Sequence, residues 1–419
     1  MAGRRALGRQ FGWLWAAYAV SAYGSGFGFG ALPLIAVLVL HCGPAQVAAL
    51  AATGRAVGAL VAVPLGPWVE FRRKRPVMVA MDLTRCVALL SVPAAFALGL
   101  LSFAQLLLVS VVTAAADIAF KAAGGAYLKA LVPPADLLVA NGRFESTTWT
   151  STTVGPPLGG AAIGLFGPVT TVVADAVSYL LSALGIRAIG GTEPLPARTG
   201  AARLRAGDLL AGWRHILSHP ALRPLFVNSI VVNGLIMASQ PLLAVLLLGR
   251  LGFAPWQYGL AFAAPCVGGL IGSRLAHPLA TRFGRHRVLR TSGALRACWP
   301  LGLAFVQPGV PGLVVIIVVQ LGVVTCCGVF NPLLATARLD HTAPDRVART
   351  LAAWSISSSA AIAAVTALWG LLAAVTGLRT AIAAAGVLLL ATPLLLPRRE
   401  NVSRDELTDT GVQEAVDPV

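Results

Sequence analysis

The chain has 419 residues, of which 57% are hydrophobic and only 11% are charged, and its mean hydropathy is +0.79. An average soluble domain carries roughly a quarter charged residues, so this composition excludes an ordinary soluble surface. A net charge of +16 would suggest nucleic acid in a soluble protein. Here the arginines and lysines cluster in short loops between long apolar runs, which indicates a polytopic membrane protein and no nucleic-acid partner.

Apolar segments recur along the chain, and a membrane-spanning helix needs about 20 such residues. We predict six helices in the first half, at 11–38, 47–69, 77–100, 103–126, 144–166 and 169–189. Six more follow, at 223–248, 256–276, 288–306, 311–333, 350–374 and 380–397. The expected fold is an all-α membrane protein with twelve transmembrane helices in two pseudo-symmetric six-helix bundles, 11–189 and 223–397.

Polar segments flank the two bundles. Residues 1–10 form a short N-terminal segment, 190–222 a linker with an amphipathic helix, and 398–419 a tail expected to be disordered. The loops at 72–75 and 282–290 are rich in arginine and lysine, whereas those at 41–46 and 307–312 carry none. This positive-inside pattern places both termini in the cytoplasm of a multi-pass protein of a bacterial cell membrane.

The first predicted helix contains GSGFGFGALPL at 24–34, with a glycine at every second position from Gly24 to Gly30. The stretch loosely matches a dinucleotide-binding fingerprint, but that motif needs a strand before it and a βαβ unit around it. Glycine inside an apolar segment instead favours close packing or bending of a membrane helix.

Charged residues inside a bilayer cost at least roughly 2.5–3.5 kcal/mol each, so each needs a partner, water or a function. Asp117 and Lys121 are four apart on one helix face. They form either a mutually neutralising pair or a protonation site, and both interpretations can hold together. Asp175 and Arg55 lie at similar depth, so they are expected either to pair or to act separately in proton coupling. Glu145 is expected to cap the start of the fifth helix.

A second set of charges near the basic loops predicts a latch that closes the cytoplasmic side and breaks when the two halves separate. A purely topogenic role is the alternative for its basic run. The set comprises Gly66, Glu70, Arg73, Lys74, Arg75, Asp82, Arg85, Arg285 and Arg296. The segments 70–86 and 281–298 align so that Arg85 falls on Arg296, which suggests a transporter built from repeats.

Amides and aromatic residues within the helices are candidates for a substrate cavity, with helix packing as the alternative for each. They are Tyr18, Tyr23, Trp149, Asn228, Asn233 and Gln240.

Several motifs resemble those of the major facilitator superfamily (MFS), in its twelve-helix branch of drug and natural-product exporters. GPWVEFRRKRP at 66–76 resembles the loop between helices 2 and 3, and HPLATRFGRHR at 277–287 resembles its degenerate copy. GPPLGG, with Gly155, Pro156, Gly159 and Gly160, resembles the fifth-helix element of proton-coupled antiporters. MDLTRC, DIAFKAAGGAYLKALVP, ANGRFE and DAVSYLLSA resemble the macrolide-efflux and siderophore-export subgroup, and the resemblance covers residues 11 to 397.

The resemblance implies a monomeric secondary transporter that exports an amphiphilic small molecule, such as a drug, an antibiotic or a siderophore-like product. Its other partners would be protons and the lipid bilayer, with Asp117 as the proton-linked acid of an antiporter. An importer of a nutrient or metabolite and a non-transporting receptor remain alternatives. The sequence contains no catalytic triad, metal cluster or phosphate loop, so we expect no enzyme activity, no cofactor and no metal site.

Overall fold

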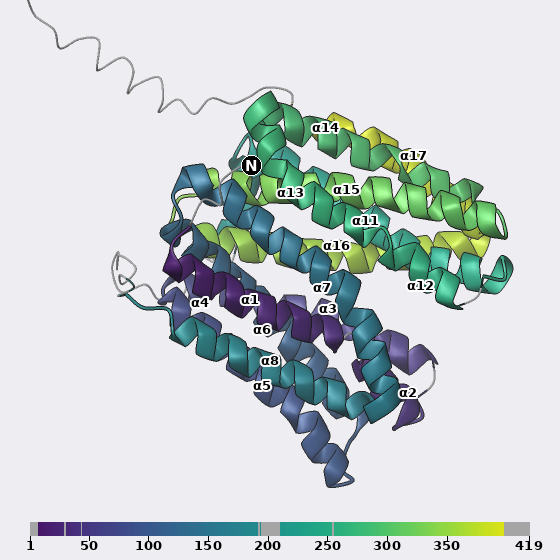
Figure 1. Cartoon of the computed structure of the whole chain (residues 1–419), viewed down its shortest axis with the longest axis horizontal. Coiled ribbons are helices and arrows are strands. Elements are labelled where there is room, and N and C mark those ends of the chain that lie inside the picture. The colour runs from purple at the N-terminus through teal and green to yellow at the C-terminus, as the bar shows by residue number, and fades with distance from the viewer. Residues whose placement is uncertain are drawn as a thin grey trace, which may run out of the picture.

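The computed structural model describes residues 7–28, 31–42, 44–191, 193, 210–253 and 255–397, and within these ranges every regular element is a helix (Figure 1). The first bundle consists of α1 (Arg9–Phe27), α2 (Ala31–Leu38), α3 (Pro44–Ala62), α4 (Leu65–Glu70), α5 (Lys74–Ala97), α6 (Phe103–Leu131), α7 (Leu137–Phe166) and α8 (Pro168–Arg187). The second consists of α11 (Leu222–Ala244), α12 (Pro255–Ala263), α13 (Cys266–Phe283), α14 (Arg285–Cys298), α15 (Val310–Asp340), α16 (Val347–Thr376) and α17 (Leu378–Ala391).

Helices occupy all twelve predicted segments, although some segments are broken. The second is interrupted after Ala62, beside Pro64, and the eighth before Cys266, beside Pro265, as expected where proline removes a backbone donor. Among the described residues, nine helices are long and apolar enough to cross a membrane. The remaining three segments are helical as well, so twelve crossings stays a prediction.

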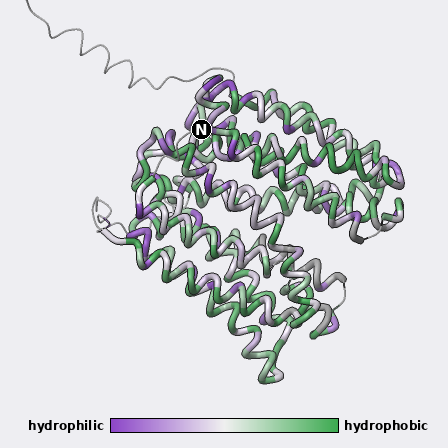
Figure 2. Tube along the Cα trace, viewed as in Figure 1, coloured by the Kyte–Doolittle hydropathy of each residue, from purple (hydrophilic) through white to green (hydrophobic). Residues whose placement is uncertain are grey.

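Hydrophobic residues follow the lengths of the helices in both bundles (Figure 2), and many large apolar side chains are exposed. Leu98, Leu165 and Val375 expose 72%, 77% and 86% of their surface, respectively. So much exposed apolar surface suits contact with lipid and does not suit contact with water.

One end of the molecule carries the basic loops, and we call it the basic end. The starts of α1, α5 and α14 lie there, with their arginines and lysines. The two bundles meet at this end and diverge toward the other (Figure 1). Leu339 and Val347 of the second bundle join a core of the first, and Ile356 packs with Ala59 and Ile118 of the first.

The glycines of α1 allow its backbone to contact α7. A Cβ atom built on Gly155 would lie 2.6 Å from the carbonyl carbon of Gly26. One built on Gly159 would lie 2.0 Å from the carbonyl oxygen of Phe27. The alternating glycines and the GPPLGG motif therefore meet at one helix crossing, which only residues without a side chain permit.

Between the bundles, the linker contributes α10 (Ala211–Ser218). Its apolar face packs on protein, because Gly212 contacts the backbone of Arg349 and Trp213 Nε1 donates to Ser357 Oγ over 2.7 Å. The described part of the predicted linker thus contains a short helix, and α16 covers its apolar face. The rest of the predicted linker, at 194–209, the segment 1–6 and the predicted tail 398–419 lie outside the described residues.

Candidate transport site

A cavity of about 350 Å³ lies between the two bundles. Helices α1, α5, α6 and α7 line it from the first bundle, and α15 and α16 from the second. Its lining combines apolar and aromatic side chains, including Leu14 and Phe144, with three charged ones, Lys121, Glu145 and Arg338. This mixture suits an amphiphilic ligand that needs a few fixed polar contacts.

A buried charge network borders the cavity in the first bundle. Asp117 Oδ2 lies 2.7 Å from Lys121 Nζ, and Asp117 Oδ1 lies 3.3 Å from Arg85 Nη1. Arg85 also binds Asp82, whose side chain is fully buried. The Lys121 side chain, in contrast, is 59% exposed. One carboxylate is therefore shared by a buried guanidinium and an accessible ammonium.

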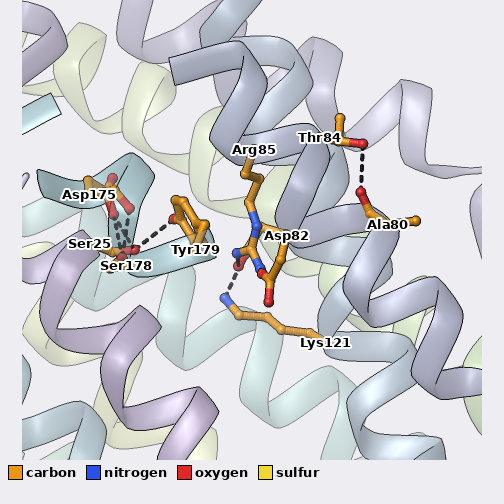
Figure 3. A network of polar contacts seen from close by, with 10 residues as sticks. Ser25, Ala80, Asp82, Thr84, Arg85, Lys121, Asp175, Ser178 and Tyr179 are labelled. Atoms are coloured by element: carbon orange, nitrogen blue, oxygen red, sulfur yellow. Dashed lines mark hydrogen bonds and ion pairs between the residues drawn. The ribbon is translucent and has the colours of Figure 1, made fainter. Parts of the chain in front are cut away.

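The network continues from Arg85 across the bundle to α8 (Figure 3). The Arg85 guanidinium lies over the rings of Phe120 and Tyr179, at 4.6 Å and 4.2 Å from their centroids. The Tyr179 hydroxyl lies 2.7 Å from Ser25 Oγ, which donates to Asp175 Oδ1 over 3.3 Å. A chain of polar groups thus connects Lys121 at the cavity with Asp175.

Asp82 and Arg85 were assigned to the cytoplasmic latch, and the structure places them about three turns inside α5, at Asp117. Their spacing near the basic loop suggested the latch, but the loop does not reach them. Asp175 interacts with the hydroxyls of Ser25 and Ser178. The side chain of Arg55 lies outside the described part of the structure, so its pairing with Asp175 stays a prediction.

Glu145 connects the bundles at the cavity. Its Oε1 accepts hydrogen bonds from Trp149 Nε1 over 2.9 Å and from Asn331 Nδ2 of α15 over 2.7 Å. The expected capping role is wrong, because α7 begins at Leu137 and Glu145 lies inside it. Trp149, predicted for the cavity, orients this carboxylate and packs against Gly269 of α13.

The other predicted cavity residues divide into two groups. Tyr18 lines the cavity, and its hydroxyl lies 2.7 Å from Thr148 Oγ1. Tyr23, Asn228, Asn233 and Gln240 are not part of the cavity lining. Tyr23 exposes 39% of its surface, and Asn233 and Gln240 are half-buried on α11. None of the described residues that line the cavity belongs to α11, which the amides in its sequence did not reveal.

Asn228 is fully buried in the second bundle. Its side chain donates to the carbonyl of Thr392 over 2.8 Å and accepts from Arg296 Nη2 over 2.7 Å. The Arg296 guanidinium lies 3.6 Å from the centroid of the Phe330 ring. Arg296, assigned to the latch, is therefore a core residue like its repeat counterpart Arg85, and both stack on aromatic rings.

Contacts across the bundles close the basic end. Arg349 Nε of α16 lies 2.7 Å from Glu70 Oε2 of α4, and a Cβ atom on Gly66 would lie 2.9 Å from Ala352 Cβ. Lys129 donates to the carbonyls of Leu339 and Thr342 from the second bundle. We call these contacts the basic-end gate. Burial raises the pKa of the Glu70 carboxyl to about 7, although the charges of Arg349 and Lys74 act in the opposite direction.

The remaining predicted latch residues make no described contact between the two bundles. The Lys74 ammonium donates to the carbonyls of Val69, Glu70 and Arg72. Arg75 donates to the carbonyls of Ile189 and Gly191, Arg73 is exposed at the start of α5, and Arg285 lies 3.3 Å from Asp340. Sequence reasoning missed Arg349 and Lys129 as gate residues. A weak similarity between the segments at 133–143 and 343–354 is a signal that could have pointed to the region of Arg349.

Two helical bundles around a central cavity that borders a charge network define a membrane transporter. The chain belongs to the Major Facilitator Superfamily, whose family model matches residues 14–327 and 237–415. The expected family and the all-α membrane fold of this family are thereby confirmed, whereas the count of twelve spans stays a prediction, and a transporter is not an enzyme.

Two curated relatives are multidrug efflux pumps named Tap. The protein from Mycolicibacterium fortuitum is 25% identical over 297 residues, covering 68% of this chain and 70% of its own length. That from Mycobacterium tuberculosis (strain ATCC 25618 / H37Rv) is 27% identical over 285 residues, covering 66% and 67%, respectively.

Solved structures show the same fold at lower identity. A bacterial homologue of the iron transporter ferroportin, in an outward-facing state, is similar with a TM-score of 0.80 at 16% identity, covering 93% of this chain and 98% of that one. The human organic anion transporter MFSD10 (TETRAN) is similar with a TM-score of 0.76 at 16% identity, covering 93% of this chain and 99% of that one. The E. coli fucose:proton symporter FucP is similar with a TM-score of 0.73 at 14% identity, covering 93% of this chain and 98% of that one.

Proposed function

We propose that this transporter exports an amphiphilic small molecule in exchange for protons, with its basic end and both termini on the cytoplasmic side. The drug-efflux names of its relatives and the apolar, partly charged lining of the cavity support export of such a molecule. The positive-inside pattern of the loops supports the orientation. In this orientation, the basic-end gate closes the cytoplasmic side.

The shared carboxylate of Asp117 carries the proposal of proton coupling. A proton on Asp117 weakens its ion pair with Lys121, and a cationic group of a substrate competes with Lys121 for the same oxygens. The proton and the substrate therefore exclude each other at one carboxylate. Mutually exclusive binding, coupled to a preference of each ligand for one conformation, produces exchange. The proposed substrate accordingly carries a cationic centre on an apolar body.

Inverted membrane vesicles with an acidic lumen test the proposal, using a cationic dye such as ethidium as the probe. We expect the gradient to drive dye into the lumen, and Asp117→Asn to abolish the dependence on the gradient. Asp340→Asn is the matched control, because Asp340 pairs with Arg285 at the basic end and is not among the residues that line the cavity. Unchanged coupling in Asp117→Asn would remove this residue from the mechanism.

Two other outcomes favour the alternative functions. Accumulation only in right-side-out vesicles would favour an importer. The absence of flux for a broad panel of cationic, neutral and anionic compounds would favour a receptor that does not transport.

A further inference from the structure

A second pocket, of about 320 Å³, lies at the basic end between α10 and the start of α16. Its polar lining consists of Arg214, His215, Ser218, Arg346 and Arg349. Among the described residues that line it, none is acidic. Three guanidinium groups therefore surround one small space, and this space is separate from the central cavity.

In the part of the chain that the structure describes, two acids lie near this pocket, and they do not cancel its charge. Glu70 is not in the lining and pairs with Arg349 Nε. The Asp345 carboxylate lies 3.7 Å from Arg346 Nε, but both side chains are largely exposed, at 73% and 61%. An ion pair so exposed contributes little. Among the described residues, two acids beside three arginines leave an excess of positive charge, and like charges that face one space repel each other.

The start of α16 adds to this positive field. Arg346 is the N-cap residue of α16, Arg349 lies in its first turn, and this turn contains no acidic residue. Cations are unfavourable at a helix N-terminus because its partial charge is also positive. An anion with several oxygens relieves this repulsion, and the planar guanidinium fork fits the oxygens of a phosphate group in particular.

We infer that the pocket between α10 and α16 binds a phosphate group, which belongs either to a soluble phosphate compound or to the headgroup of an anionic lipid. Arg349 also holds Glu70 of the first bundle. An occupant of the pocket therefore connects the linker helix to α16 at a contact that belongs to the basic-end gate. The inference does not depend on the transported substrate or on the direction of transport.

Thermal unfolding of the full chain in neutral phosphatidylcholine nanodiscs tests the site, with inorganic phosphate and pyrophosphate titrated at constant ionic strength. We expect both anions to raise the apparent Tm of the wild type. Arg214→Gln and Arg346→Gln should each weaken the apparent affinity about tenfold, as expected for a lost charge-assisted hydrogen bond. The control is Arg282→Gln, because Arg282 is exposed at the same end and lies outside the pocket; it should keep the wild-type affinity.

Nanodiscs that contain phosphatidylglycerol distinguish the two sources of the phosphate group. A lipid headgroup in the pocket would raise the Tm of the wild type, but not of the double variant Arg214→Gln/Arg346→Gln, and would suppress the effect of added phosphate. A soluble ligand predicts no difference between the two lipids. Should the double glutamine variant fail to fold, Arg214→Lys/Arg346→Lys replaces it. This variant keeps both charges but lacks the planar guanidinium groups, so its affinity for phosphate should still fall. Equal responses of the wild type and the folded variants would overturn the inference.

Discussion

The crossing of α1 and α7 makes a sharp prediction about three glycines of one motif. A Cβ atom on Gly159 would lie 2.0 Å from the Phe27 oxygen and one on Gly155 would lie 2.6 Å from the Gly26 carbonyl carbon, whereas one on Gly160 meets nothing within 4 Å. The obstructing atoms are backbone, which cannot rotate away. We expect Gly159→Ala and Gly155→Ala to destabilise the protein by about 1–3 kcal/mol through overpacking, with Gly159→Ala the more severe.

The intrinsic helix preference of alanine acts in the opposite direction by about 1 kcal/mol, and at Gly160 it acts without any clash. Gly160→Ala should therefore match or slightly exceed the wild type. Apparent Tm values from tryptophan fluorescence in one detergent check this order. We expect the lowest Tm for Gly159→Ala, a higher one for Gly155→Ala, and the highest values for the wild type and Gly160→Ala. Equal Tm values for Gly159→Ala and Gly160→Ala would refute the assigned helix crossing.

Two further predictions concern buried charges. Replacing Asn228 by leucine leaves the Arg296 guanidinium buried without its amide, so Asn228→Leu should cost about 3 kcal/mol. Its apparent Tm should fall well below that of Asn233→Leu, a half-buried site on the same helix; equal losses would contradict the pairing. Glu70 has a pKa of about 7 in the closed gate against an ordinary value of 4.5, so its ionised form is disfavoured there and rising pH favours opening. If the opened gate hydrates Glu70 and restores the ordinary value, the closed-to-open ratio falls about tenfold between pH 6 and pH 8. Spin labels at Arg73→Cys and Ala343→Cys in a cysteine-free background would report this change in distance, and Glu70→Gln should abolish its pH dependence.

The membrane class and the positions of the helices were predictable from the sequence, because long apolar runs and basic loops report directly on lipid and on topology. The boundary of α7 was not. Its first turns contain ANGRFE, which looks like a loop, yet Asn141 of this stretch is buried and donates to Thr336 of α15. A helix that packs against a polar partner inside a protein need not be apolar where it enters the membrane.

The partners of the buried charges were the least predictable feature. Asp82, Arg85 and Asp117 meet because α5 and α6 pack face to face, and nothing in either segment alone specifies that rotation. The same reason explains why the partner of Asn228 was not predicted, since its side chain points into the second bundle and binds Arg296. Hydrophobic periodicity is weak in helices that are apolar on most sides, so the sequence carries little information about which polar side chain faces the cavity.

The asymmetry between the two buried arginines favours the first bundle as the place of the proposed proton site. Arg85 has two carboxylates, Asp82 and Asp117, whereas Arg296 interacts with the amide of Asn228. If Asp117 takes up a proton, Arg85 keeps Asp82 and is not left as an unpaired buried charge, which would be strongly unfavourable. The charge that loses its partner is Lys121, whose side chain is already 59% exposed at the cavity, so water that enters the cavity can solvate it. Protonation of Asp117 thus releases an accessible cation and leaves the buried pair intact, a condition that a reversible proton site inside a membrane must meet.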